Sequence, residues 1–177
     1  GRMIQNAGAD RILTIDIHSE QQQGFVDIPW DNLYGSISLI PELINHDFKD
    51  LVVASPNKGG VARATAYAKR LGVQGIAIVF KERDINIVNH SEAVEMIGDV
   101  EDADVIIVDD IIDTGGTMVE AANMLMERGA RKVSAVATHG LFSGPAVDRI
   151  NSSQIAEVLV TDSVNIRPEA LRSPKIQ

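Results

Sequence analysis

The sequence predicts an α/β fold, namely a doubly wound, mainly parallel sheet with flanking helices. Short runs of apolar, β-branched residues recur along the chain, and segments with helical periodicity separate several of them. The runs are apolar at nearly every position, which is typical of parallel strands buried on both faces. Alternating strands and helices then indicate the doubly wound arrangement. The expected strands are residues 11–16, 51–55, 75–80, 105–110, 132–139 and 156–162.

Two of the segments between these runs have the spacing and the stop signals of helices. In residues 59–72 apolar side chains recur three or four positions apart, and Gly72 follows the last of them. In residues 117–130 a similar pattern ends at Gly129, and glycine often follows a helix end. The side chains expected to face the sheet are Val61, Ala64, Ala68 and Leu71 in the first helix, and Met118, Ala121, Ala122 and Leu125 in the second.

Composition and charge exclude several classes of protein. A chain of 177 residues with 45% apolar residues can bury the core of one domain, or of one and a piece. The formal net charge of -9 argues against a nucleic-acid partner, because a phosphate backbone calls for clustered Lys and Arg. The absence of cysteine excludes disulfides and thiolate chemistry. No apolar run approaches the roughly 20 residues that span a bilayer, so we expect a soluble, cytoplasmic protein without a membrane partner.

The two ends of the sequence differ from those expected of a complete protein. Only a short segment that could be helical, residues 3–9, precedes the first expected strand, so we expect that some sheet neighbours of that strand are missing. The chain stops at residues 173–177, where a final strand could begin. We therefore expect a fragment, or a chain whose ends were cut or lost.

The stretch VIIVDDIIDTGGTM, residues 105–118, carries the main functional signal. Ligands of open α/β sheets bind beyond the carboxyl ends of strands, and residues 109–117 lie between an expected strand and an expected helix. Glycines at such a turn let backbone N–H groups approach a phosphate, and threonines add hydroxyl donors. The residues expected to hold the phosphate are Thr114, Gly115, Gly116 and Thr117.

The acids of this stretch fit a ligand with two polar ends. Asp109 and Asp110 are expected to accept the hydroxyls of a vicinal diol, while Asp113 caps the turn that holds the phosphate. A ribose 5-phosphate meets both requirements. Read alone, residues 113–116 could equally be an ordinary helix N-cap and turn. Neither a P-loop nor a Gly-x-Gly-x-x-Gly dinucleotide motif is present in the chain.

Several ordered segments together carry a resemblance to a known family. VDDIIDTGGTM is similar to the phosphoribosyl diphosphate (PRPP) binding signature of type I phosphoribosyltransferases and PRPP synthetases. With four longer segments included, nearly the whole chain resembles ribose-phosphate diphosphokinase, the PRPP synthetase. These segments are LTIDIHSEQQQGFVDIPWDNLYG, VVASPNKGGVARATAYAKRLG, GDVEDADVIIVDDIIDTGGT and ATHGLFSGPAVDRI.

The resemblance implies a fold, a domain division and a reaction. The fold would be of the phosphoribosyltransferase type, with residues 1–35 ending an N-terminal domain and residues 36–177 forming a C-terminal domain that is truncated at its end. The reaction would transfer the diphosphoryl group of ATP to ribose 5-phosphate, giving PRPP and AMP, with Mg²⁺ accompanying the ATP. The family also implies a homo-oligomer, from dimer to hexamer, and phosphate or nucleotide effectors.

The resemblance also assigns roles to single residues. Lys81 and Arg83 match a Lys and an Arg that stabilise the transferring group, and Arg83 would also contact ribose 5-phosphate. His18 matches a ligand of Mg-ATP. The second metal ligand of the family is an Asp, where this chain has Asn57, and a neutral amide should bind Mg²⁺ more weakly.

Two other functions stay open on the sequence. A non-catalytic regulatory subunit associated with PRPP synthetase would explain Asn57, whereas the intact acid stretch and Lys81 with Arg83 oppose it. A type I phosphoribosyltransferase would share the PRPP signature, but SPNKGG and DIH match the synthetase better.

Overall fold

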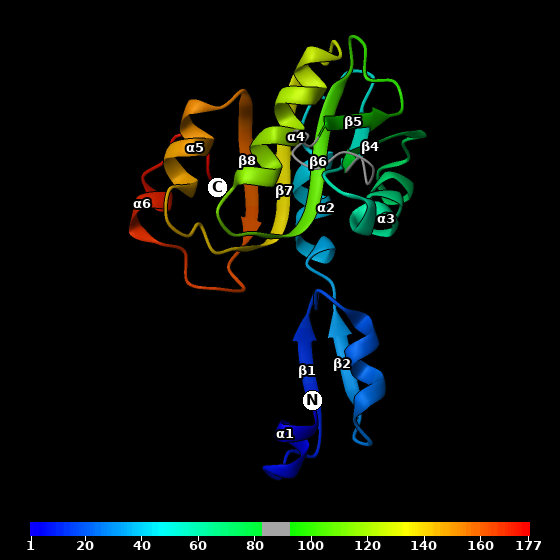
Figure 1. Cartoon of the computed structure of the whole chain (residues 1–177), viewed down its shortest axis with the longest axis vertical. Coiled ribbons are helices and arrows are strands. Elements are labelled where there is room, and N and C mark those ends of the chain that lie inside the picture. The colour runs from blue at the N-terminus through cyan, green and yellow to red at the C-terminus, as the bar shows by residue number, and fades with distance from the viewer. Residues whose placement is uncertain (83–92) are drawn as a thin grey trace, which may run out of the picture.

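Two sheets organise the protein in the computed structural model, which describes residues 1–82 and 93–177 (Figure 1). The strands are β1 (Ile12–Ile15), β2 (Trp30–Leu33), β3 (Val52–Ser55), β4 (Gly75–Glu82), β5 (Ala93–Ile97), β6 (Asp104–Ile112), β7 (Lys132–Gly140) and β8 (Ile155–Thr161). The α-helices are α1 (Arg2–Asn6), α2 (Ser36–Ile44), α3 (Val61–Leu71), α4 (Gly116–Glu127), α5 (Ala146–Ser152) and α6 (Pro168–Leu171). The 3-10 helices are η1 (Glu20–Phe25) and η2 (Lys58–Gly60).

The larger sheet has the strand order β5-β4-β3-β6-β7-β8. Every neighbouring pair is parallel except β4 and β5, which run antiparallel at one edge. The chain moves outward from β3 to β4 and then returns to the other side of β3 to form β6. The strand order therefore reverses between β3 and β6, and the carboxyl ends of these two strands flank the position where such sheets bind ligands.

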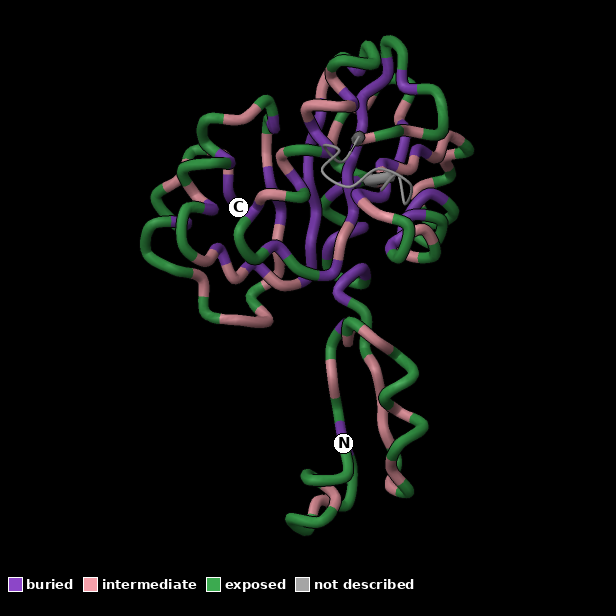
Figure 2. Tube along the Cα trace, in the orientation of Figure 1, coloured by how far each residue is buried: buried purple, intermediate pink, exposed green. Residues whose placement is uncertain are grey.

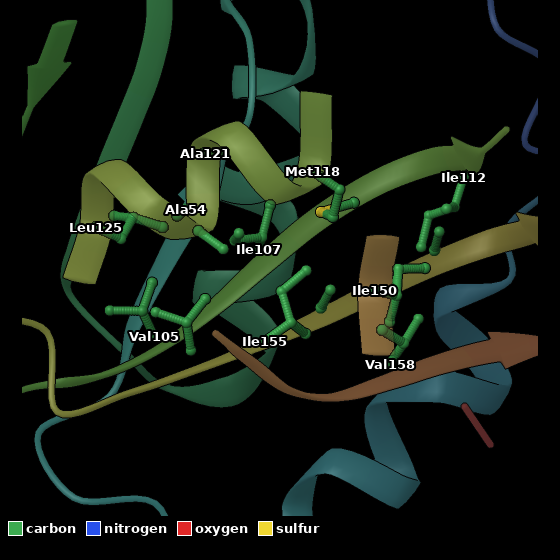
Figure 3. Packing of buried hydrophobic residues seen from close by; sticks show 14 of the residues in the cluster. Ala54, Val105, Ile107, Ile112, Met118, Ala121, Leu125, Ile150, Ile155 and Val158 are labelled. Atoms are coloured by element: carbon green, nitrogen blue, oxygen red, sulfur yellow. The ribbon is translucent and has the colours of Figure 1, made fainter. Parts of the chain in front are cut away.

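Buried apolar side chains on alternate positions of β6 serve the two faces of the sheet in turn. Val105 and Ile107 pack with the side of the sheet that α4 and α5 cover, and Figure 3 shows this cluster at close range. Ile106 and Val108 pack with α2 and α3 on the opposite side. The continuous apolar run in the sequence is thus explained by burial on both faces, and the doubly wound fold is confirmed.

The two helices expected from periodicity are present. Met118, Ala121, Ala122 and Leu125 of α4 are all buried, as predicted. In α3 the buried side chains are Ala64, Tyr67 and Ala68, whereas Val61 and Leu71 are only partly buried. Tyr67 was not predicted, because its apolar ring and polar hydroxyl leave its position in a periodic pattern ambiguous. Both helices end near the expected glycines, Gly72 at φ 73° and Gly129 at φ 91°.

Each expected strand is present, with its ends within two residues of the predicted ones. The sequence patterns missed β2 and β5. The first is short and polar at its centre, and the second is a short edge strand that Glu95 interrupts at its centre. At the end of the chain Ile176 bridges Val158 in parallel, as the expected additional strand would.

Strands β1 and β2 form a separate parallel pair that projects from the main sheet (Figure 1). Most of this pair is exposed or half-buried, in contrast to the buried centre of the larger sheet (Figure 2). Asp16, buried and at φ 41°, accepts hydrogen bonds from Gly35 N at 2.7 Å and from Thr138 Oγ1 at 2.5 Å. A Cβ at position 35 would lie 2.6 Å from Thr138 Oγ1, so glycine permits this close approach. The pair is thereby tied to the end of β7.

No helix in the described part of the chain has the length and apolar character to cross a membrane.

The segment before β3 is held to the sheet by a buried carboxylate at the start of β6. Asp104 Oδ2 accepts the Lys49 N–H at 2.9 Å, and Asp104 Oδ1 accepts from Arg131 Nε at 3.0 Å. Arg131 also donates to Lys49 O at 2.8 Å. Burial acts to raise the pKa of Asp104, but hydrogen bonds from Arg131 and the Lys49 amide outweigh it, so this pKa lies below its ordinary value.

Replacing Asp104 with Asn should lower the free energy of unfolding at pH 7 by about 1–3 kcal/mol, because a buried charged hydrogen-bond acceptor is lost. A carboxyl group whose pKa is lowered by folding stabilises the protein above its unfolded-state pKa, and this stabilisation disappears as the pH falls through the folded-state pKa. The difference between Asp104→Asn and wild type should therefore shrink below about pH 4. Urea denaturation across this pH range measures it, with the exposed Asp47→Asn as control. An equal difference at pH 3 and pH 7 would contradict the assignment.

Candidate functional site

A pocket of about 200 Å³ lies at the reversal of strand order. It brings together residues from the end of β6, the turn into α4, the turn after β3 and the segment after β1. Its lining residues are His18, Asn57, Asp109, Asp110, Ile111, Ile112, Asp113, Thr114, Gly115, Gly116, Thr117 and Met118. All residues predicted for the acid stretch and its turn, together with His18 and Asn57, therefore meet in one place.

The acid pair at the end of β6 is held by two cationic or cation-forming side chains. Asp110 Oδ2 lies 2.8 Å from His18 Nδ1. The guanidinium of Arg63 spans both carboxylates, with Nη1 at 3.3 Å from Asp109 Oδ1 and Nη2 at 3.4 Å from Asp110 Oδ2. The side chains of Asp109 and Asp110 are only 14% and 4% exposed, so these partners offset charges that are largely removed from water.

The environments of the two carboxyl groups drive their pKa values apart. Burial raises the pKa of Asp109 to about 6, and the neighbouring Asp110 carboxyl adds to the effect. Burial also acts to raise the pKa of Asp110, but Arg63 and the hydrogen bond with His18 outweigh it and lower this pKa. Asp110 is thus the firmly ionised member of the pair. Asp109 is the member whose charge would benefit most from a new hydroxyl donor.

The glycine turn provides the backbone donors that a phosphate requires. Gly115 lies at φ 73°, in the left-handed region, and is the N-cap of α4. The first N–H groups of a helix have no partner inside it, so those at the start of α4 are available to an anion in the pocket. Thr114 and Thr117, whose side chains carry hydroxyls, are among the residues that line the same pocket.

The expectation that Asp113 caps this turn is wrong. No side chain of the described residues caps α4, because Gly115 takes the N-cap position two residues further on. The main-chain carbonyl of Asp113 instead accepts the Ser143 N–H at 2.9 Å. Asp113 therefore contributes by anchoring the loop after β7 beside the pocket, and it is one of the residues that line the cavity.

Two arginines of the site were missed from the sequence. Arg63 comes from the first turn of α3, 46 positions before the Asp109 that it contacts. Arg149 of α5 donates from Nη1 to Thr114 O at 3.1 Å, at the edge of the glycine turn. Neither forms a local motif with its partner. A useful signal would have been their placement in helices that start or end at the same edge of the sheet as the acid stretch.

The donor set does not fit a divalent cation bound by the protein. In the described residues no group of three or more His, Asp or Glu side chains could hold a metal ion. Asn57 Oδ1, the expected second contact, accepts the Gly60 N–H at 2.9 Å, and His18 Nδ1 faces Asp110. Mg²⁺ prefers several hard, anionic oxygens. The predicted ligands His18 and Asn57 are close to the same pocket, but their chemistry gives a metal little support.

The predicted cations of strand β4 are only partly within the described residues. The backbone of Lys81 pairs with Val94 near the end of β4, beyond the last residue of β3 that pairs with this strand. The side chain of Lys81 and the whole of Arg83 lie outside the described residues. Their predicted role in catalysis is therefore a proposal.

Comparisons with known proteins agree with this geometry. Residues 84–177 match the family model of the phosphoribosyl synthetase-associated domain. The chain is 49% identical over 173 residues to the ribose-phosphate pyrophosphokinase of Vibrio parahaemolyticus, a match that covers 98% of this chain and 54% of that protein. The chain thus spans about half the length of the curated relatives it matches.

Solved structures support the same fold. The crystal structure of phosphoribosylpyrophosphate synthetase from Mycobacterium smegmatis matches with a TM-score of 0.90 and 37% identity, covering 99% of this chain and 56% of that one. Adenine phosphoribosyltransferase from Thermoanaerobacter pseudethanolicus matches with a TM-score of 0.54 and 23% identity, over 71% of this chain and 77% of that one, which bears on the fold alone. The fold is the type I phosphoribosyltransferase fold. The chain belongs to the phosphoribosyl synthetase-associated domain family.

Proposed function

We propose that this chain is part of a ribose-phosphate diphosphokinase, which transfers the diphosphoryl group of ATP to ribose 5-phosphate and forms PRPP and AMP. The observation that carries the proposal is one pocket in which a buried acid pair adjoins a glycine turn at the start of a helix, at the reversal of strand order. The names of the relatives, ribose-phosphate pyrophosphokinase and phosphoribosylpyrophosphate synthetase, support the same activity.

The acceptor sugar would bind across the two halves of the pocket. Its phosphate would lie against the first N–H groups of α4, with hydroxyl donors from Thr114 and Thr117. Its diol would donate to the Asp109 and Asp110 carboxylates, which Arg63 holds in place. A hydroxyl donor favours the ionised form of Asp109, so sugar binding offsets part of the cost of burying that charge.

The transfer itself requires positioned charge more than covalent chemistry by the protein. The anomeric hydroxyl oxygen bonds to the β-phosphorus of ATP and loses its proton to water, the bond from that phosphorus to the α,β-bridging oxygen breaks, and AMP leaves. Lys81 and Arg83 would stabilise the charge that develops on the diphosphoryl group. ATP would enter as its Mg²⁺ complex, in which the metal offsets phosphate charge, since the described residues do not supply a fitting set of metal ligands.

One observation favours a second function, a non-catalytic regulatory subunit. The carboxylate that the family places after Ser55 and Pro56 is replaced by Asn57, whose side-chain oxygen is already used by Gly60 N–H. Such a subunit would keep phosphate-ester binding and lack turnover. A cytoplasmic location, a homo-oligomer, phosphate or nucleotide effectors, and a domain boundary between residues 35 and 36 belong to the main proposal and rest on the family resemblance.

Formation of AMP from Mg-ATP and ribose 5-phosphate tests the enzyme proposal. A coupled assay should detect AMP with this chain or with a longer natural protein that contains it. Asp109→Asn should lower kcat/KM about 10- to 100-fold, because one charged hydrogen bond to the substrate is lost. The matched control is Asp47→Asn, an exposed carboxylate that does not line the pocket. If the longer protein binds ribose 5-phosphate but shows no turnover, the regulatory subunit is favoured over the enzyme.

Substitution of Gly116 by Val should abolish measurable binding of ribose 5-phosphate, because the side chain would fill the phosphate end of the pocket. A Cβ at this position would lie 3.7 Å from Arg149 Nη1 and 3.9 Å from Thr114 Oγ1, which are ordinary contact distances. The variant should therefore fold, and its thermal unfolding midpoint serves as the control. Calorimetric titration with ribose 5-phosphate measures the affinity. Unchanged affinity would refute the placement of the phosphate.

A further inference from the structure

The turn after β3 holds Asn57 in one orientation. Asn57 is the N-cap of η2, and its Oδ1 accepts the Gly60 N–H at 2.9 Å. Ser55 Oγ donates to Asn57 O at 2.6 Å and fixes the backbone of the same residue. Because an N–H can only donate, the side-chain oxygen must face Gly60, and the amide nitrogen must take the other side. Within the described residues that nitrogen has no hydrogen-bond partner, and it is not buried.

This orientation reverses the chemistry of the position. An aspartate here could accept from Gly60 with one oxygen and present the second oxygen to a cation. Asn57 keeps the first contact but presents two N–H donors in place of that oxygen. Donors of this kind suit a phosphate oxygen and repel a metal ion. With the oxygen used by the cap, the amide leaves N–H donors where a carboxylate would leave an acceptor.

The next residue adds a positive charge beside these donors. Lys58 is exposed, and its Nζ lies 4.4 Å from the centre of the Phe80 ring. The aromatic face attracts the ammonium group and holds it in place beside the Asn57 donors. Lys58, Asn57 and Phe80 line a second pocket of about 380 Å³. Glu120 lines that pocket too, and a bound phosphate would have to lie at the Asn57 and Lys58 end of it.

The second pocket continues from the first. Asn57 and Thr117 line both cavities, so a ligand that begins at the glycine turn can extend past Asn57 toward Lys58. The described residues offer no metal-binding cluster at this junction. We propose that Asn57 and Lys58 form a diphosphate-binding pair that contacts phosphate oxygens directly and works without a metal ion bound to the protein. The inference deepens the proposed function, because it names how this chain would hold the diphosphoryl group of its nucleotide.

Binding of inorganic diphosphate in EDTA tests the pair. Isothermal titration of the full chain should show binding without Mg²⁺, and Lys58→Ala should weaken it about tenfold, as expected for one lost charge-assisted contact. The matched control is Lys69→Ala, which removes the same charge from an exposed lysine on α3. Both lysines are exposed, so neither variant should unfold.

Asn57→Asp provides the reciprocal test. A carboxylate can still accept from Gly60 N–H, so the cap and the fold should persist, whereas the second oxygen now repels a phosphate. This variant should lose diphosphate affinity in EDTA and regain it when Mg²⁺ is added, while wild type should change little. Wild-type binding that strictly requires Mg²⁺, or Lys58→Ala with unchanged affinity in EDTA, would overturn the inference.

The two proposals can fail separately. Diphosphate binding in EDTA without AMP formation would support the diphosphate-binding pair and refute the enzyme proposal. AMP formation by a protein that binds diphosphate only with Mg²⁺ would support the enzyme proposal and refute the diphosphate-binding pair.

Discussion

The site depends on the burial of strand β6 on both faces and its pairing on both edges. Val105 and Ile107 pack toward α4, Ile106 and Val108 pack toward α3, and β3 and β7 hold the strand in register. A shift by one residue would send every apolar side chain to the other face. The strand therefore has one available position, and its carboxyl end delivers the acids and the glycine turn to the same edge as the end of β3.

Burying two adjacent carboxylates is costly, and the neighbouring elements supply the compensation. Arg63 from α3 contacts both Asp109 and Asp110, while His18 contacts Asp110 from the segment after β1. The compensation is incomplete, as the raised pKa of Asp109 indicates. A site that retains an unfavourable charge is suited to a ligand with hydroxyl donors. The turn at Asn57 complements this acid end with N–H donors and the Lys58 cation. In the proposed function, the acid end suits the hydroxyls of the sugar, and the Asn57 end suits the phosphates of the donor nucleotide.

Local patterns predicted some features well and misjudged others for identifiable reasons. The apolar strands were predicted correctly because burial on both faces requires apolar residues at consecutive positions. Strand β2 was missed because Trp30–Leu33 is polar at its centre, and β5 because it lies at an edge. Asp113 was assigned as a cap because Asp is a favoured capping residue, but Gly115 in the left-handed conformation took that position. Both Asp113 and Gly115 are plausible capping residues in the sequence, and only the backbone geometry shows which one is the N-cap of α4.

The sequence by itself determined the α/β class, the main strands, the two long helices and the acid-and-glycine stretch, because each follows from residues that are neighbours along the chain. Tertiary structure decided which distant side chains complete the site. His18 lies 92 positions from Asp110, and Arg63 lies 46 positions from Asp109. It also decided that Asn57 uses its side-chain oxygen as the cap of η2. Such contacts leave no local pattern, because they arise from the order in which the strands assemble in the sheet.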